Sequence, residues 1–193
     1  MGDDRLRGMD LTRSVVETNA EEYRREEPLF SVEQEAIDIF PSMFAAGDFG
    51  FRDAEWVVMW YYRRFLGEFS HAKRQAVEAE FGENDYETIH QAIADAVSTV
   101  DPEAKVERLT DLSGVDVPIA TGFLMFIDPE AYVVVGEREW TVLRDAGALS
   151  DPYPDPPTAA EYVTYLDCCR DLADRFDCDL WTLYMALWRL WKA

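Results

Sequence analysis

The residues most suggestive of chemistry form a short turn, Gly114-Val115-Asp116-Val117-Pro118, between two predicted helices. The backbone N–H groups in the first turn of a helix have no intrahelical acceptor, so such a turn can bind a phosphate. A second interpretation is that Asp116 is simply an N-cap and Pro118 part of the first helical turn, as both residue types prefer. The helix start would then need no ligand. The sequence leaves both interpretations open.

Residues 52–74 form a locally basic stretch, with five basic residues against three acidic ones. Aromatic residues adjoin the arginines in the run WYYRR. Arginines beside aromatic rings suit phosphate contact and base stacking. This makes Arg63, Arg64 and Arg74 candidates for a nucleic-acid surface. The alternative is a core helix whose aromatic side chains are buried and whose arginines pair with the surplus of carboxylates.

Residues that bind metals are scarce. The three cysteines are Cys168, Cys169 and Cys178, and the two histidines, His71 and His90, lie in other segments. This spacing does not match a zinc site, so we expect reduced, partly buried thiols and no bound metal. The sequence also has no Gly-rich phosphate loop, HExxH or G-x-S-x-G motif. We therefore expect no cofactor.

The chain carries 39 acidic and 18 basic residues, a formal net charge of −21. The excess is spread along the sequence and arginine is favoured over lysine, which indicates a halophilic protein. In molar salt the Debye length is about 3 Å, so repulsion across an acidic surface is small. The alternative is an acidic mimic of nucleic acid. At ordinary salt this charge would oppose DNA binding, but at molar salt only local charge matters, so net charge does not settle whether DNA is a partner.

Nearly the whole chain has helical patterns, and no segment sustains the period of two that a strand requires. The sequence predicts an all-α domain over residues 29–193, preceded by a loosely attached arm over residues 1–28. Pro41 should kink or split its helix, and capping boxes are predicted at Ser31 and at Thr158. The predicted helices cover residues 11–25, 32–46, 52–66, 71–80, 85–100, 102–112, 117–127, 137–146, 159–176 and 180–192.

The longest apolar runs are far too short to cross a lipid bilayer. The first residues, MGDDRLRGMD, have no apolar core of the kind found in a signal peptide. We therefore expect a cytoplasmic protein without a membrane partner.

Several motifs resemble the helix-hairpin-helix DNA glycosylase superfamily, and in particular its uncharacterised members similar to 8-oxoguanine glycosylases. The first is the hairpin at residues 114–118, the second is Asp128-Pro129 with Tyr132, and the third is residues 136–138. The segments FGENDYETIHQAI and EYVTYLDCCRDLA…LWTLYMALW, at residues 81–93 and 161–188, are also similar. The similarity covers roughly residues 50–190. It implies a two-lobed, all-helical scaffold and double-stranded DNA as a partner.

The resemblance also indicates which chemistry the chain lacks. In bifunctional members a hairpin lysine attacks the sugar, and Pro118 occupies that position. Gly136 occupies the position of the aspartate that stabilises the cationic sugar, and a glycine supplies no charge. Asp116 replaces the second hairpin glycine and would face a DNA phosphate. Glu137 is the remaining catalytic candidate, although one residue along a helix rotates the side chain by about 100°.

Three functional hypotheses follow. The first is a non-catalytic DNA-binding relative of these glycosylases. The second is a protein-interaction or structural protein on the same scaffold, with no DNA binding. The third is an active glycosylase or lyase that uses Glu137, which the replaced catalytic positions disfavour. Under the first hypothesis the DNA-binding residues are Arg63, Arg64, Arg74, Gly114, Val115 and Arg138.

Two further features have alternative interpretations. Arg138 lines the groove that a flipped base would enter, or instead holds Asp128 or a neighbouring helix end in place. Trp181, Trp188 and Trp191 follow a helical spacing, which predicts a packing stripe or, where the rings are exposed, a surface that binds a protein partner.

Overall fold

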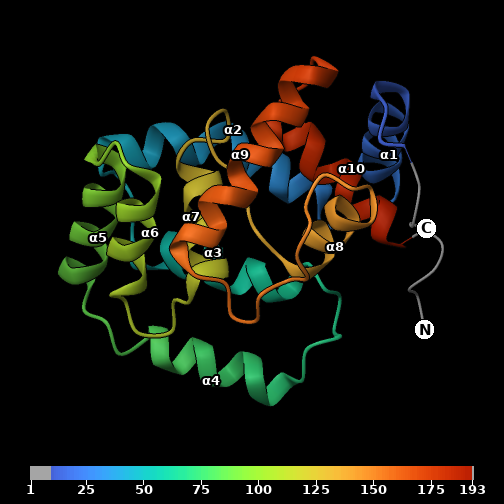
Figure 1. The fold of residues 1–193 in the computed structure, drawn as a ribbon. Helices are drawn as coiled ribbons and strands as arrows, with labels where there is room; N and C mark the ends of the chain where they lie inside the picture. Colours follow the sequence, from blue (N-terminus) through green and yellow to red (C-terminus); the bar gives the residue numbers. More distant parts are fainter. Residues whose placement is uncertain (1–9, 193) are drawn as a thin grey trace.

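The computed structural model describes residues 10–192, and in this range the chain forms helices and no strands (Figure 1). The prediction of an all-α protein is therefore confirmed. The helices are α1 (Arg13–Glu26), α2 (Phe30–Ala46), α3 (Phe51–Arg63), α4 (His71–Phe81), α5 (Tyr86–Ser98), α6 (Pro102–Thr110), α7 (Val117–Ile127), α8 (Glu137–Asp145), α9 (Ala159–Phe176) and α10 (Leu180–Lys192).

Local signals located most helix ends correctly. The predicted capping box at Thr158 is present, because the Thr158 hydroxyl accepts from the Glu161 N–H and the Glu161 carboxylate accepts from the Thr158 N–H. The predicted capping box at Ser31 is wrong, because the N-cap of α2 is Leu29. Of the two outcomes expected at Pro41, a kink or a split, the split does not occur, since α2 runs through the proline. Burial of apolar residues on both sides of the proline holds the two halves of α2 against the core.

The helix α7 is the centre of the core. Every residue from Pro118 to Ile127 is buried, and the helix packs against α2, α3 and α6. Phe126 meets the edge of the Trp60 ring of α3, with 4.8 Å between ring centroids. A Cβ added at Gly122 would come within contact distance of the same indole, at 3.4 Å, so α3 and α7 lie close together there. The hairpin that precedes α7 is therefore attached to a rigid, fully buried helix.

The segment Val133–Val135 leads from α7 towards α8 and is completely buried. A buried backbone without a strand partner must find hydrogen bonds elsewhere. The Tyr162 and Tyr165 hydroxyls of α9 donate to the Val133 and Val134 carbonyls, at 3.1 and 3.2 Å. The Val135 N–H donates to the Thr121 hydroxyl at 3.0 Å. These bonds fix the start of α8 relative to α7.

The N-terminal segment differs from the loosely attached arm that we expected. Residues 1–9 lie outside the described range, but α1 packs along α10 (Figure 1). Tyr23 is buried, and its hydroxyl donates to Glu33 at 2.6 Å. Arg189 and Lys192 of α10 each donate to Glu27 at 2.8 Å. The mostly polar sequence of α1 includes a narrow apolar stripe, and burial of that stripe is sufficient to dock α1 on α10.

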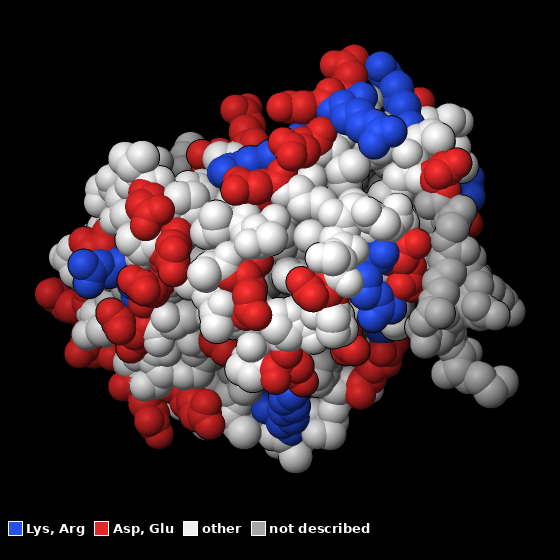
Figure 2. Space-filling model, in the orientation of Figure 1, with Lys and Arg blue, Asp and Glu red and all other residues white. Residues whose placement is uncertain are grey.

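The surface is strongly acidic, as the composition requires. Figure 2 shows carboxylates spread over much of the visible face, whereas basic side chains occur there at only a few places. None of the described helices combines the length and the apolar character needed to cross a membrane.

Candidate functional site

The hairpin turn lies against the C-terminal end of α4. Gly114 has φ +75°, a left-handed conformation that favours glycine. A Cβ at this position would lie 2.8 Å from the Phe81 backbone nitrogen and 3.0 Å from the Val77 carbonyl oxygen. Asn84 also bridges to the turn, because its side chain accepts from the Ser113 N–H and donates to the Ser113 carbonyl, both at 3.0 Å. Gly114 thus allows the hairpin backbone to lie close to the backbone of α4.

Asp116 has the conformation and contacts of an N-cap. Its carboxylate accepts from the Ile119 N–H at 3.0 Å, and Pro118 lies in the first turn of α7. Loss of hydration raises the pKa of Asp116, although the Ile119 N–H and the nearby Lys73 act in the opposite direction. The Val115 N–H donates to the Leu112 carbonyl at 3.2 Å. Several N–H groups of the hairpin are therefore already bonded within the chain.

A cleft of about 390 Å³ opens beside this hairpin, and we call it the hairpin cleft. It joins the start of α7 to the start of α8, two segments that the sequence singled out separately. The end of α3, the loop before α4, the loop before α9 and the end of α10 complete its walls. The cleft is lined by Tyr61, Tyr62, Phe65, Glu68, Phe69, Lys73, Asp116, Pro118, Glu137, Arg138, Tyr153, Asp155 and Trp191.

The cations of the hairpin cleft are engaged by other groups of the chain. Arg138 forms an ion pair with Glu68, and its guanidinium lies 4.8 Å from the Phe65 centroid. Lys73 lies 5.0 Å from the centroid of Phe69. Contacts of this kind between cations and aromatic faces are stabilising. Arg138 thus lines a cleft and is paired with Glu68, rather than with the Asp128 that the structural alternative named.

The carboxylates of the cleft are less completely matched. Four of the lining residues are acidic and two are basic. Glu137 is exposed at the mouth of the cleft, and neither Glu137 nor Asp155 forms an ion pair or a side-chain hydrogen bond within residues 10–192. The cleft is consequently rich in hydrogen-bond acceptors and has a negative charge, with aromatic rings on its walls.

Arg64 is not on the surface, so it fits the core-helix alternative for residues 52–74 and not the nucleic-acid surface. Its side chain is 1% exposed and forms an ion pair with Glu139, which is 0% exposed, at 2.8 Å. The guanidinium lies 4.5 Å from the Tyr61 centroid and 5.1 Å from the Trp188 centroid. The Nε and Nη2 atoms of Arg64 and the Oε2 atom of Glu139 have no hydrogen-bond partner within the described range, residues 10–192. Adjacent arginines at the end of α3 thus face opposite environments: Arg63 is exposed and Arg64, the C-cap, is buried.

Gly136 has a role beneath the cleft that the sequence did not reveal. Its φ is −154°, an extended conformation that any residue adopts. A Cβ here would lie 2.5 Å from Glu139 Oε2 and 2.7 Å from Arg64 Nη2. Absence of a side chain at position 136 therefore leaves room for the buried ion pair. No local pattern marks Glu139 as buried, because its partner is contributed by another helix.

The other predicted residues lie in varied positions. Arg63 is exposed and Arg74 is half-buried, and neither lines the hairpin cleft. Val115 is buried. Trp181 and Trp188 are also buried, whereas Trp191 is 37% exposed and reaches the cleft. The tryptophan spacing is thus mainly a packing stripe. Tyr153 and Asp155 were missed because a proline-rich loop gives no periodic signal for where its side chains point.

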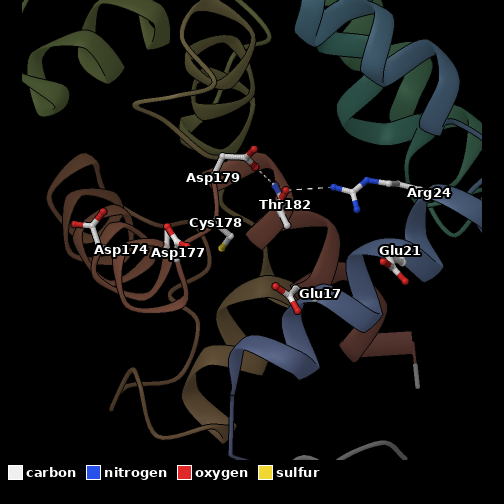
Figure 3. A pocket seen from close by; sticks show the side chains of 9 residues that line it. Glu17, Glu21, Arg24, Asp174, Asp177, Cys178, Asp179 and Thr182 are labelled. Carbon is white, nitrogen blue, oxygen red and sulfur yellow. Dashed lines mark hydrogen bonds between the residues drawn. The ribbon is translucent and has the colours of Figure 1, made fainter.

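A second, acidic groove of about 690 Å³ lies between α1 and the α9–α10 turn (Figure 3). Asp179 is an N-cap there, since it accepts from the Thr182 N–H at 2.6 Å, and Asp177 pairs with Arg13. Burial raises the pKa of the Cys178 thiol to about 11, which keeps it protonated at neutral pH. No group of three metal-ligating side chains is suitably placed within residues 10–192.

Comparison with known proteins leaves the hairpin resemblance as an interpretation. No family model matches the chain, and neither the curated proteins nor the solved structures yield a match.

Proposed function

We propose that this chain is a non-catalytic binding protein on a scaffold like that of the helix-hairpin-helix glycosylases, and that it binds a positively charged segment of a protein partner. The hairpin cleft is the proposed binding site. The observation that carries this proposal is the unmatched charge in the cleft, where neither Glu137 nor Asp155 has a basic partner among the residues that the structure describes. Electrostatic complementarity of this kind selects partners and guides their approach.

The surroundings of the hairpin favour a protein partner over DNA. Phosphate binding requires free N–H donors and nearby cations. Here α4 covers one side of Gly114, Asn84 occupies the Ser113 N–H, and Asp116 occupies the Ile119 N–H. The buried guanidinium of Arg64 cannot reach a phosphate. DNA binding would depend on Arg63 and Arg74 outside the cleft.

The cleft also supports a binding role more strongly than glycosylase chemistry. Pro118 offers no nucleophile, and Gly136 offers no carboxylate. Glu137 lines the cleft, as the catalytic alternative requires, but it is exposed to solvent at the mouth. A general acid or an electrostatic stabiliser works best where water is excluded.

The test compares two ligands at potassium chloride concentrations up to molar. One is a fluorescein-labelled peptide with two arginines and two lysines among serines and alanines, and the other is labelled duplex DNA containing an abasic-site analogue. We expect the peptide to bind and the DNA not to bind. Glu137→Gln/Asp155→Asn should weaken peptide binding about tenfold, because it removes two charge-assisted contacts.

A matched double variant controls for the acidity of the whole protein. Glu107 and Asp171 are exposed and lie outside the hairpin cleft. Glu107→Gln/Asp171→Asn removes the same charge, so a general attraction would weaken equally in both double variants. Equal weakening would refute the proposal. DNA binding that Arg63→Glu/Arg74→Glu abolishes would replace it with the DNA-binding hypothesis.

A further inference from the structure

The aromatic and acidic walls of the hairpin cleft are matched to one kind of cation. Resting on the proposed function, we infer that the group entering the cleft is the guanidinium of an arginine side chain of the partner protein. A guanidinium is planar, carries five N–H donors and stacks on aromatic faces, whereas an ammonium is a compact, strongly hydrated charge.

The first support is the balance of donors and acceptors on the walls. Asp116, Tyr153 and Asp155 all line the cleft. Burial, followed by the nearby Tyr61, Glu139 and these two aspartates, raises the pKa of Tyr153 above its ordinary value, which keeps the phenol neutral. The wall therefore presents several acceptor oxygens to one cleft. A ligand with several donors in one plane can bond to more of these oxygens than a ligand with a single donor direction.

A hydroxyl of the cleft wall that has no partner among residues 10–192 is the second support. Tyr62 is 6% exposed and lines the cleft, and its hydroxyl forms no hydrogen bond with residues 10–192. Burial and the nearby Asp116 raise its pKa above the ordinary value, so the hydroxyl stays protonated. The hydroxyl oxygen is thus free to accept a hydrogen bond from an occupant of the cleft that carries several polar hydrogen atoms.

The third support is that this fold already binds guanidinium groups in the same way. The Arg138 guanidinium lies 4.6 Å from the Trp188 centroid and pairs with Glu68. Below it, the Arg64 guanidinium lies among aromatic rings and pairs with Glu139. Both arrangements combine ring faces with one carboxylate. The remaining rings and carboxylates of the cleft, including Trp191 and Asp155, offer this combination to an external group.

The experiment uses three small cations with the same stem and charge: butylguanidinium, butylammonium and butyltrimethylammonium. Their dissociation constants are measured by NMR chemical-shift titration of the full chain at fixed ionic strength. We expect butylguanidinium to bind at least about threefold more tightly than either of the others, because only it offers planar, multiple donors. Shift changes should centre on Tyr153, Trp191 and the start of α8.

Two variants test the assignment of the wall. Asp155→Asn should weaken butylguanidinium binding about tenfold, and Tyr62→Phe about threefold. Glu107→Gln is the control and should have no effect, and circular dichroism checks that each variant is folded. Equal affinity for all three cations, or shift changes outside the cleft, would overturn the inference. The proposed function would survive that result if the labelled peptide still bound at the cleft, and it would fail separately if the peptide did not.

Discussion

Replacement of Gly114 by alanine tests the contact between the hairpin and α4. The substitution introduces a left-handed alanine and places a Cβ 2.8 Å from the Phe81 backbone nitrogen. The chain contains a matched control in Gly147, whose φ of +77° is nearly that of Gly114, +75°. No atom lies within 4 Å of a Cβ built at Gly147. The two substitutions therefore share the backbone strain and differ in the steric overlap.

The magnitudes follow from these two contributions. A left-handed alanine costs about 1–2 kcal/mol, partly offset by about 0.4–1 kcal/mol from restricting the unfolded chain. Gly147→Ala should therefore lower the free energy of unfolding by about 1 kcal/mol. The overlap at position 114 involves backbone atoms that cannot rotate away, and overpacking adds about 1–3 kcal/mol. Gly114→Ala should lower the free energy of unfolding by about 3 kcal/mol.

Thermal and urea unfolding followed by circular dichroism would measure the difference. For a chain of this size each kcal/mol shifts the Tm by about 2–4 °C. We expect Gly147→Ala to lower the Tm by about 2–4 °C and Gly114→Ala by about 6–12 °C. Equal losses in the two variants would refute the packing of the hairpin on α4. That result would also reopen the alternative that Gly114 allows an external phosphate to approach the hairpin backbone closely.

Two further predictions concern charged groups. Glu139→Gln should lower the free energy of unfolding by about 3–5 kcal/mol, because it leaves Arg64 buried without a counter-charge. Arg64→Met/Glu139→Leu should lower it by less. Urea unfolding measures both variants, and a larger loss in the double variant would contradict this prediction. Burial alone would raise the pKa of Glu27, but hydrogen bonds from Lys192 and Arg189 hold it below its ordinary value of 4.5. The stabilisation by this carboxylate is therefore present above pH 4.5 and is lost as the pH falls through the lower folded value. The stability difference between the wild type and Glu27→Gln should narrow over that acidic range, and a constant difference would contradict the assignment.

Much of the helical architecture could be predicted because its signals are local. The bounds of α7, α9 and α10 were predicted from capping residues and apolar spacing, and the structure has the same bounds. Asp116 is an N-cap, which was one of the two interpretations of the turn that the sequence left open. The split that was one of two outcomes expected at Pro41 does not occur, because packing along α2 outweighs one lost backbone hydrogen bond.

The candidate site was less accessible from the sequence because its contacts are distant along the chain. Arg63 and Arg64 are indistinguishable in a basic stretch, and only the position of Glu139, 75 residues away, decides which of them is buried. Gly136 was interpreted through a resemblance, whereas the contact that excludes a side chain there comes from α3 and α8. Trp191 lines the cleft near the end of α10, where the adjacent Lys192 donates to Glu27, the C-cap of α1.

The pairing of α1 with α10 has a consequence for how the protein is made. The Arg189–Glu27 contact joins residues 162 positions apart, so α1 leaves the ribosome long before its partner exists. Because chains emerge at about 5–20 residues per second, α1 remains without α10 for roughly ten seconds or more. During that time its apolar stripe, including Val16 and Tyr23, is uncovered. Cotranslational folding can assemble the central helices early, but the hairpin cleft gains Trp191 only when synthesis has reached α10.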